Sequence, residues 1–443
     1  MKKPVVSIVQ YRDINSIAEA IHLCDGFSSL KTSDKVLLKP NICAYGAGLM
    51  PPYAMVTTTV VLEGTVRSLR DHGIADIIIA DGAAVDDPGI STTEMAFSWL
   101  QLDKLAKRYG IKLVDLNRGP FREITVENLR IEVAETALET DFFVSVPVLK
   151  THYSLRVSIA GKNLKGCVSM RSKKFFHHDS GDTLEHRLSL LMEAIPQHLV
   201  VVDGIYAMAK GPDVMLGVAH PKGVLVASTD FLAADAIGTR LLGGEPTEAE
   251  YLRLYAQKNN RMNVMEQPDA IEVRGEPLES HSVYLPWHER TFSDTLKAAG
   301  HTGIEYLGDD TMCTGCFGNM LLSTTAVSAL SRNCDFGGIV ILSGRNIACD
   351  QNSPKTLLFG NCAIKKNKHL DKATKVKGCP PDMQACLKEM VGHMRGARRR
   401  TDFSLRYDRF MRNRRECTGW LPLPTWKEYE SNTEFSLRYY KGE

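Results

Sequence analysis

The stretch Lys35-Val36-Leu37-Leu38-Lys39-Pro40-Asn41 shows the pattern on which the fold prediction depends. A short apolar run ends at polar residues, and a stretch with helical periodicity follows at residues 57–72. Apolar runs of this length are typical of strands that are buried on both faces, as in a parallel sheet covered by helices. The pattern therefore predicts an α/β fold with a doubly wound, mostly parallel sheet. It returns at residues 76–80, 112–114, 142–149, 199–202 and 223–227.

Further candidate helices lie between these strands, at residues 94–109 and 231–242. The signals weaken between residues 250 and 300, and a cysteine-rich region follows. Seven of the eleven cysteines fall between Cys313 and Cys386. We therefore expect three parts: an α/β domain at residues 1–300, a smaller α/β domain at 301–394, and a basic arm at 395–443.

The composition is that of an ordinary globular protein, with 44% hydrophobic and 24% charged residues among 443. The net charge of +2 gives no overall attraction to nucleic acid or membrane. No stretch approaches the roughly 20 apolar residues of a membrane span, and the N-terminus lacks the apolar run of a signal peptide. We expect a cytoplasmic protein whose cysteines are reduced or bound to metal.

In sheets of this kind, ligands bind outside the carboxyl ends of the strands. The residues that close the apolar runs are therefore site candidates. An aspartate after a strand also commonly caps a helix or forms a turn, and this alternative applies above all to Asp115 and Asp230. The candidates are Lys39, Asn41, Asp81, Lys150, His152, Asp203 and Asp230.

The loop at residues 150–167 is rich in basic residues and contains no acid. It carries Lys150, Arg156, Lys162 and Lys165, and it lacks the glycine order of a P-loop or of a dinucleotide fingerprint. Lysine ammoniums and backbone N–H groups in such a loop can hold an anion; the alternative is a solvated basic loop. The segment at residues 173–179 is expected to form a lid or a wall of the site rather than a metal centre.

Several of these motifs resemble the domain-of-unknown-function family 362, over about residues 5–245. The resemblance lies in Lys39-Pro40-Asn41, Asp81-Gly82, Lys150-Thr151-His152, the stretch Gly161 to Gly166 that contains Asn163, and Asp203-Gly204-Ile205. It also lies in the stretch Ser228 to Asp235. The resemblance implies a fold and a redox context, because members often carry iron–sulfur domains, commonly of ferredoxin type. This sequence has no Cys-x2-Cys-x2-Cys-x3-Cys-Pro run of that type.

The C-terminal cysteines come in three short motifs: Cys313-Thr314-Gly315-Cys316, Gly360-Asn361-Cys362 and Gly378-Cys379-Pro380. Four thiolates at one point suit an iron–sulfur cluster or a structural zinc; free thiols are a third alternative. Zinc ribbons usually pair two Cys-x2-Cys knuckles, and only one is present. No metal role is assigned to Cys167, Cys334, Cys349 or Cys386, although one of the last three could serve as a substitute ligand.

These motifs, in this order, resemble the proximal 4Fe–4S motif of nickel–iron hydrogenase small subunits, over about residues 308–392. The resemblance implies a small flavodoxin-like domain and a 4Fe–4S cluster. It also implies the ligands Cys313, Cys316, Cys362 and Cys379.

The last segment combines arginines and aromatic residues, and it contains a short repeat: residues 401–407 return as 433–439. Each copy could dock in an equivalent groove on the same chain or on a second copy of it, giving a homo-oligomer. A contact for an acidic electron carrier such as ferredoxin or flavodoxin is the other expected role. Nucleic-acid binding is not expected, because the rest of the chain has no basic excess.

The leading functional hypothesis is a 4Fe–4S oxidoreductase or reductive activator. The lysine-rich cleft would hold a small anionic substrate or cofactor through Lys39, Asn41, Asp81, Lys162, Asn163 and Lys165. In this hypothesis Lys150, His152 and Asp203 are the catalytic candidates, and the last two would move protons. The alternatives are a non-catalytic electron-transfer or cofactor-maturation protein, and a hydrolase or ligase of a phosphorylated small molecule with a structural cluster.

Overall fold

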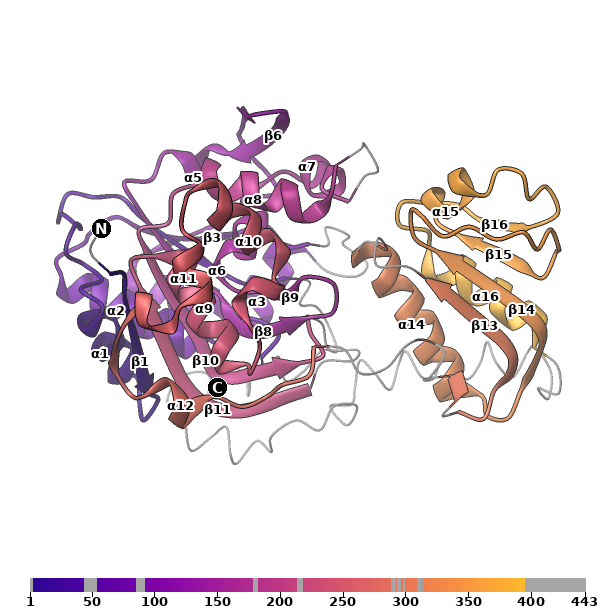
Figure 1. Cartoon of the computed structure of the whole chain (residues 1–443). Coiled ribbons are helices and arrows are strands. Elements are labelled where there is room, and N and C mark those ends of the chain that lie inside the picture. Colours follow the sequence, from indigo (N-terminus) through magenta and orange to yellow (C-terminus); the bar gives the residue numbers. More distant parts are fainter. Residues whose placement is uncertain are drawn as a thin grey trace. The chain divides into compact units, whose positions relative to one another are not determined.

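The computed structural model describes residues 3–43, 54–84, 92–177, 182–212, 218–287, 292, 296–297, 299–308, 312 and 314–394. The chain divides into two compact units between Trp287 and His288 (Figure 1). The first unit holds the described residues up to Phe176 and again those of Leu184–Trp287; the second holds those of His177–Thr183 and of His288–Cys417. The basic arm predicted at residues 395–443, with its repeat, lies outside the described residues.

The first unit is built on a ten-stranded, mostly parallel sheet, as the sequence predicts. Among the described strands of this sheet, only β11 and β9 run against their neighbours. Strand β8 (Val148–His152) pairs with β10 and with β9 (Arg156–Val157) beside the main path. The main path is β12 (Glu272–Gly275), β1 (Val5–Gln10), β11 (Val218–Ser228), β10 (Leu199–Ala209), β7 (Phe142–Val146), β2 (Val36–Pro40), β3 (Ile77–Asp81) and β4 (Lys112–Asp115).

Both faces of this sheet are apolar, which is why its strands read as continuous hydrophobic runs. Alternate residues of β2 point to opposite sides: Leu37 belongs to one buried cluster, and Val36 and Leu38 belong to the other. Helices cover both clusters. On one face lie α1 (Asn15–Leu23), α2 (Thr59–Asp71), α3 (Thr93–Trp99) and α4 (Leu102–Tyr109); on the other lie α6 (Ala160–Asn163), α8 (Leu184–Ala194), α9 (Phe231–Leu241) and α10 (Glu250–Lys258).

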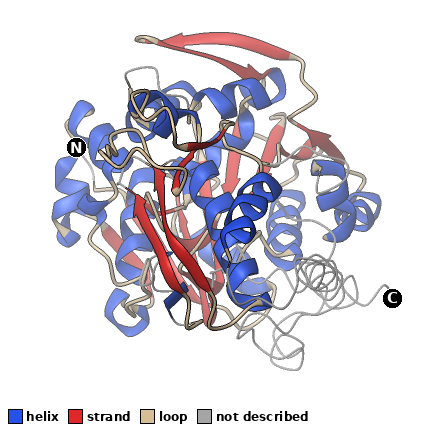
Figure 2. Cartoon of the chain, turned by 90° about the vertical axis from the view of Figure 1, so that its right-hand side faces the viewer, coloured by secondary structure: helices blue, strands red, loops and turns tan. Residues whose placement is uncertain are grey.

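The remaining elements of the first unit are short. Strands β5 (Phe121–Val126) and β6 (Leu129–Ala134) form a separate antiparallel pair at the top of the unit in Figure 1 and Figure 2. The others are the α-helices α5 (Glu135–Leu138), α7 (Met170–Phe175), α11 (Met262–Glu266) and α12 (Leu278–His281), and the 3-10 turns Leu164–Cys167, Pro246–Glu248 and Pro268–Ala270.

Two sequence-based boundaries are wrong, each for a local reason. The single helix expected at residues 94–109 is two helices, because Gln101 takes a left-handed backbone conformation, with φ of 53°, between α3 and α4. Strand β10 does not end at Asp203 but continues to Ala209, since it goes on pairing with β11 beyond an irregularity at Gly204.

The second unit contains a four-stranded parallel sheet in the order β13 (Thr302–Gly308), β14 (Asp335–Ser343), β15 (Thr356–Phe359), β16 (Thr374–Val376). Its helices are α14 (Thr314–Leu330), α15 (Asn361–Lys366) and α16 (Met383–His393). The described strands follow one another in sequence order. The reversal of strand order that a flavodoxin-like sheet has is therefore not seen among them.

Among the residues that the structure describes, no helix is long and apolar enough to span a membrane.

Candidate functional site

A buried ion pair lies where β2 and β3 end side by side. Lys39 Nζ is 2.6 Å from Asp81 Oδ1, and both side chains are almost fully buried. The same ammonium also donates to the Pro40 carbonyl at 3.0 Å and to Asn163 Oδ1 at 3.1 Å. An ammonium has three donors, so all of those of Lys39 are used inside the protein.

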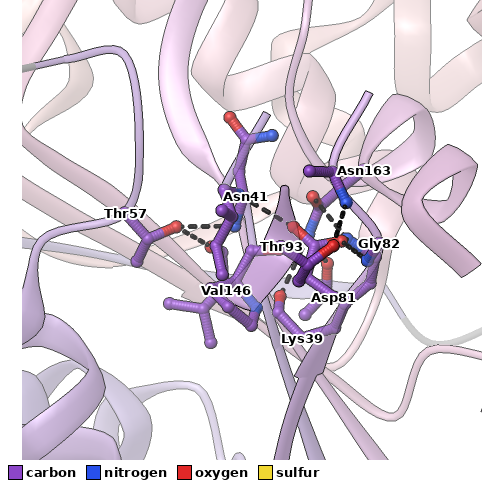
Figure 3. Close-up of polar contacts among 12 residues, drawn as sticks. Lys39, Asn41, Thr57, Asp81, Gly82, Thr93, Val146 and Asn163 are labelled. Atoms are coloured by element: carbon purple, nitrogen blue, oxygen red, sulfur yellow. Dashed lines mark hydrogen bonds and ion pairs between the residues drawn. The ribbon is translucent and has the colours of Figure 1, made fainter. Parts of the chain in front are cut away.

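Asp81 is equally well satisfied. Its Oδ2 accepts the backbone N–H of Ile42 at 2.8 Å, and its Oδ1 accepts that of Gly82 at 2.9 Å. Figure 3 shows this network at the ends of the strands. Lys39 and Asp81, both predicted as substrate-binding residues, thus lie together, but their polar atoms bind each other and the surrounding protein. We call Lys39, Asp81 and Asn163 the ion-pair network.

Asn163 connects the Lys39–Asp81 ion pair to the basic loop at residues 150–167. Its Nδ2 donates to the Lys39 carbonyl and to Ser145 Oγ, both at 3.1 Å. Gly166, in the same loop, passes so close to the ion pair that an added Cβ would lie 2.1 Å from Asp81 Oδ1. Only a glycine fits this close backbone approach.

Lys173, on α7, donates hydrogen bonds to residues that follow β3 and β4. It is buried, and its ammonium donates to the carbonyls of Gly82 and Ala83 at 2.8 and 3.2 Å and to Asn117 Oδ1 at 2.5 Å. Burial is the main cause that lowers its pKa to about 8. Lys173 belongs to the polar core and not to a lid. The sequence did not single out Asn117, because a lone asparagine after a strand carries no pattern of its own.

A second set of contacts lies around Lys150, in the middle of β8. Lys150 Nζ donates to Asn41 Oδ1 at 2.6 Å and to the Met55 carbonyl at 2.8 Å. The Asn41 backbone N–H donates to Thr57 Oγ1, whose hydroxyl donates to the Val146 carbonyl (Figure 3). Strands β2, β7 and β8 are thereby joined.

Lys162 differs from these lysines. It is partly buried on α6 and makes no hydrogen bond or ion pair with any residue that the structure describes. Burial, and then repulsion from the Lys150 ammonium, lower its pKa to about 8. An electrostatic interaction with Cys43, which no sequence motif singles out, raises the Lys162 pKa in part. Lys162 is therefore the candidate cation with donors to offer a ligand.

Asp235 of α9 positions the turn that carries Lys162. Its two carboxylate oxygens accept the backbone N–H groups of Ala160 and Gly161 at 2.7 and 2.9 Å. The side chain is fully buried, and burial raises its pKa to about 7. In the sequence, Asp235 stands out only as part of a family motif, because nothing local to it reveals a contact with residues about 75 positions away.

His152 and Asp203, the proposed proton carriers, are both buried. His152 Nδ1 accepts the backbone N–H groups of Ser154 and Leu155, each at 3.2 Å. Asp203 Oδ2 accepts the N–H of Thr58, at the start of α2, at 2.7 Å. Burial raises the Asp203 pKa to about 6. Each side chain thus has a structural role. Asp203 is in register with Val148 of β8.

Three other residues that the sequence pattern singled out have contacts of their own. Lys165 Nζ is 5.9 Å from the ring centre of Phe176. Asp115 accepts the Asn117 N–H in a turn, and Asp230 accepts the Ala233 N–H as the N-cap of α9. Because β11 is antiparallel, Asp230 follows it at the opposite edge of the sheet from Lys39. The capping and turn alternatives are therefore confirmed for these two aspartates.

In the second unit, the segments that carry three of the predicted metal ligands converge. Cys316 lies in the first turn of α14, and Cys362 lies at the start of α15. A Cβ added to Gly360 would be 3.2 Å from Cys316 Sγ, and one added to Gly315 would be 3.1 Å from the ring of Pro380, next to Cys379.

Hydrogen bonds hold these segments together. The Asn361 N–H donates to the Gly378 carbonyl at 3.0 Å, and the Gly378 N–H donates to Asn361 Oδ1 at 2.9 Å. Asn319 of α14 donates from Nδ2 to the Pro381 carbonyl at 2.7 Å. The loop of Cys379 is thereby fixed to the starts of α14 and α15.

No group of three or more metal-binding side chains is found among the described residues. Cys313, the fourth predicted ligand, lies outside them.

The first unit is therefore an α/β domain with a network of lysines at the carboxyl edge of a mostly parallel sheet. Residues 36–240 match the family described as Domain of unknown function (DUF362). This match confirms the resemblance to the family that the sequence motifs predict for this region.

One curated relative is the thylakoid-associated protein sll1697 of Synechocystis sp. (strain ATCC 27184 / PCC 6803 / Kazusa). It is 27% identical over 220 residues, which are 49% of this chain and 65% of that protein. The chain thus spans less than two thirds of this relative's length. Among solved structures, the lactate racemase apoprotein from Thermoanaerobacterium thermosaccharolyticum aligns with 88% of this chain and 80% of its own. The TM-score is 0.35 at 10% identity, and no argument rests on this similarity.

Proposed function

We propose that the second unit binds a 4Fe–4S cluster through Cys313, Cys316, Cys362 and Cys379. The observation that carries the proposal is the convergence of the segments of Cys316, Cys362 and Cys379, which are far apart in sequence. Glycines stand where backbone must pass close to a sulfur, as at Gly360. The first turn of α14 places backbone N–H groups and a positive helix end near the thiolate of Cys316.

A cluster with four cysteine ligands supplies one-electron transfer, because no iron remains open to a substrate. Zinc is the competing metal for four thiolates. In this reading the chain's own residues exclude water and hold the thiolates in place. Cys316 is buried, and α16 packs against α14.

The metal is tested by anaerobic purification, with iron, sulfide and zinc measured per chain and spectra recorded before and after dithionite. We expect iron and sulfide in equal amounts and an EPR signal after reduction. Cys362→Ala should lose the cluster. The matched control is Cys349→Ala in the same unit, where the half-buried Cys349 lies outside the converging segments. One zinc per chain without sulfide would refute the proposal.

For the first unit, we propose that Lys162 and Lys150 bind a small anionic substrate or cofactor. Lys162 has donors that no described residue accepts, and a neighbouring positive charge makes an anion a favourable partner for it. The ion-pair network of Lys39, Asp81 and Asn163 positions the loop that carries Lys162. An iron–sulfur oxidoreductase or reductive activator that acts on this anion is the leading function.

Calorimetric titration with inorganic phosphate tests the anion site. Lys162→Gln should weaken binding at least about tenfold, since a hydrogen bond to a charged group is worth about 1.5–3 kcal/mol. Lys174→Gln serves as the control, because Lys174 is exposed on α7 and is not among the predicted binding residues. Equal phosphate affinity in the wild type and Lys162→Gln would exclude Lys162 as a ligand. The non-catalytic electron carrier would be favoured if the cluster is reduced and reoxidised normally while Lys162→Gln changes no catalytic rate.

A further inference from the structure

Ser343 is the last residue of β14, which lies between β13 and β15 in the second unit. Its side chain is 0% exposed, and its Oγ has no hydrogen-bond partner among the residues that the structure describes. A buried hydroxyl without a partner has lost its hydrogen bonds to water and gained none in return. Native proteins rarely keep such a group without a role for it.

Strand pairing places Ser343 between the cysteine segments. On one side it is in register with Gly308, which ends β13 and precedes Cys313 in the chain. On the other side Leu342 is in register with Leu358. Ser343 is therefore level with Phe359, which Gly360 and Cys362 follow.

The alternation of side chains along β14 fixes the face on which Ser343 lies. Val340 and Leu342 belong to an apolar cluster that also contacts Ile364 of α15. Ser343 points to the other face, where α16 packs against β14 and α14 packs against α16. Ser343 ends β14, so its hydroxyl lies at the carboxyl edge of the sheet. Cys316 lies in the first turn of α14, and the hydroxyl is therefore on the same face of the sheet as the helix that carries Cys316.

We infer that Ser343 donates its hydroxyl hydrogen to a sulfur of the metal centre and raises the reduction potential of that centre. The inference rests on the cluster proposed above. Reduction adds negative charge to the sulfurs, and a hydrogen-bond donor stabilises the more negative state more strongly. Ser343 acts on the reduction potential through this hydrogen bond and is not a ligand of iron.

Replacing Ser343 by alanine removes the donor and leaves every described hydrogen bond of the unit in place. At a fixed potential we expect the ratio of reduced to oxidised cluster to fall about tenfold. For a one-electron couple this corresponds to a midpoint shift of about 59 mV to lower potential.

The experiment compares four full-length proteins under anaerobic conditions: wild type, Ser343→Ala, Ser343→Thr and Ser331→Ala. Ser343→Thr retains a hydroxyl and should restore much of the potential. Ser331→Ala is the matched control, because Ser331 donates to the Val327 carbonyl near the far end of α14. Iron and sulfide content, the EPR-monitored midpoint potential and the exchangeable protons seen by ENDOR after transfer to D2O are measured for each protein.

We expect equal iron and sulfide in all four proteins, a lower potential in Ser343→Ala alone, and loss of one exchangeable proton coupling in that variant. A cluster with wild-type potential and coupling in Ser343→Ala would overturn this inference and leave the cluster proposal intact. Absence of iron and sulfide from the wild type would overturn both. In the metal-free protein, Ser343→Ala should not lower the thermal unfolding midpoint; a lower midpoint would show that the hydroxyl already has a structural partner.

Discussion

Removal of the Lys39 ammonium is the sharpest test of the network at the strand ends. In Lys39→Met the side chain keeps nearly the same length, but the partner of Asp81 at 2.6 Å is lost. The carboxylate of Asp81 would then stay buried with two backbone N–H donors, from Ile42 and Gly82. Asn163 Oδ1 would lose its donor as well.

The expected loss is about 3–5 kcal/mol of unfolding free energy, which is the usual cost of leaving a buried charge uncompensated. This is a large share of the roughly 5–15 kcal/mol that stabilises a typical domain. Lys39→Met combined with Asp81→Asn removes both charges. The double variant should be more stable than Lys39→Met by about 1 kcal/mol or more, because the uncompensated charge is gone.

Urea unfolding, followed by circular dichroism, measures these free energies. Lys112→Met is the control, since Lys112 is exposed on β4, and it should change the stability by less than about 0.5 kcal/mol. A loss below about 1 kcal/mol in Lys39→Met would refute the reasoning. So would strictly additive effects of the two substitutions, because additivity would mean that Lys39 and Asp81 do not compensate each other.

Three further outcomes are expected. The folded-state pKa of Asp235, about 7, lies above the unfolded value of 3.8, so the folded protein holds a proton that the unfolded chain has lost. Wild-type stability should therefore fall as the pH rises from about 4 to 7, by up to ~4 kcal/mol from this group, and the fall should be smaller in Asp235→Asn; equal slopes in urea unfolding would contradict this. Gly166→Ala places a Cβ 2.1 Å from Asp81 Oδ1 and should destabilise the protein by about 1–3 kcal/mol, measured by thermal unfolding; no change would mean that the loop moves away freely. Gly360→Ala should lower the iron content of the purified protein, whereas Gly338→Ala, with a similar positive φ but no cysteine nearby, should not; equal iron in both would rule out crowding at Cys316 Sγ.

Much of the fold was predictable, because strands that are buried on both faces have continuous apolar runs in the sequence. The apolar run at residues 76–80 matches β3, which ends at Asp81 as predicted. The predicted helix at 231–242 differs from α9 by one residue. The break at Gln101 was missed, since the apolar spacing continues across it.

The candidate site was predictable in its parts but not in their roles. Lys39, Asp81 and Lys150 close apolar runs of the sequence and were predicted as site residues for that reason. The same rule selected Asp230, which lies at the other edge because β11 is antiparallel. Asp235 and Asn117 act through side-chain contacts that no local spacing encodes.

The sequence by itself determined which segments are strands and helices, where polar residues interrupt them, and that the cysteines gather in one C-terminal stretch. These properties depend on short-range periodicity and spacing, which the chain carries locally. The tertiary structure alone decided which strand ends share an edge and which lysine donors are already used. Strand direction and the saturation of an ammonium depend on partners that are often more than a hundred residues away, as Lys39 and Asn163 are.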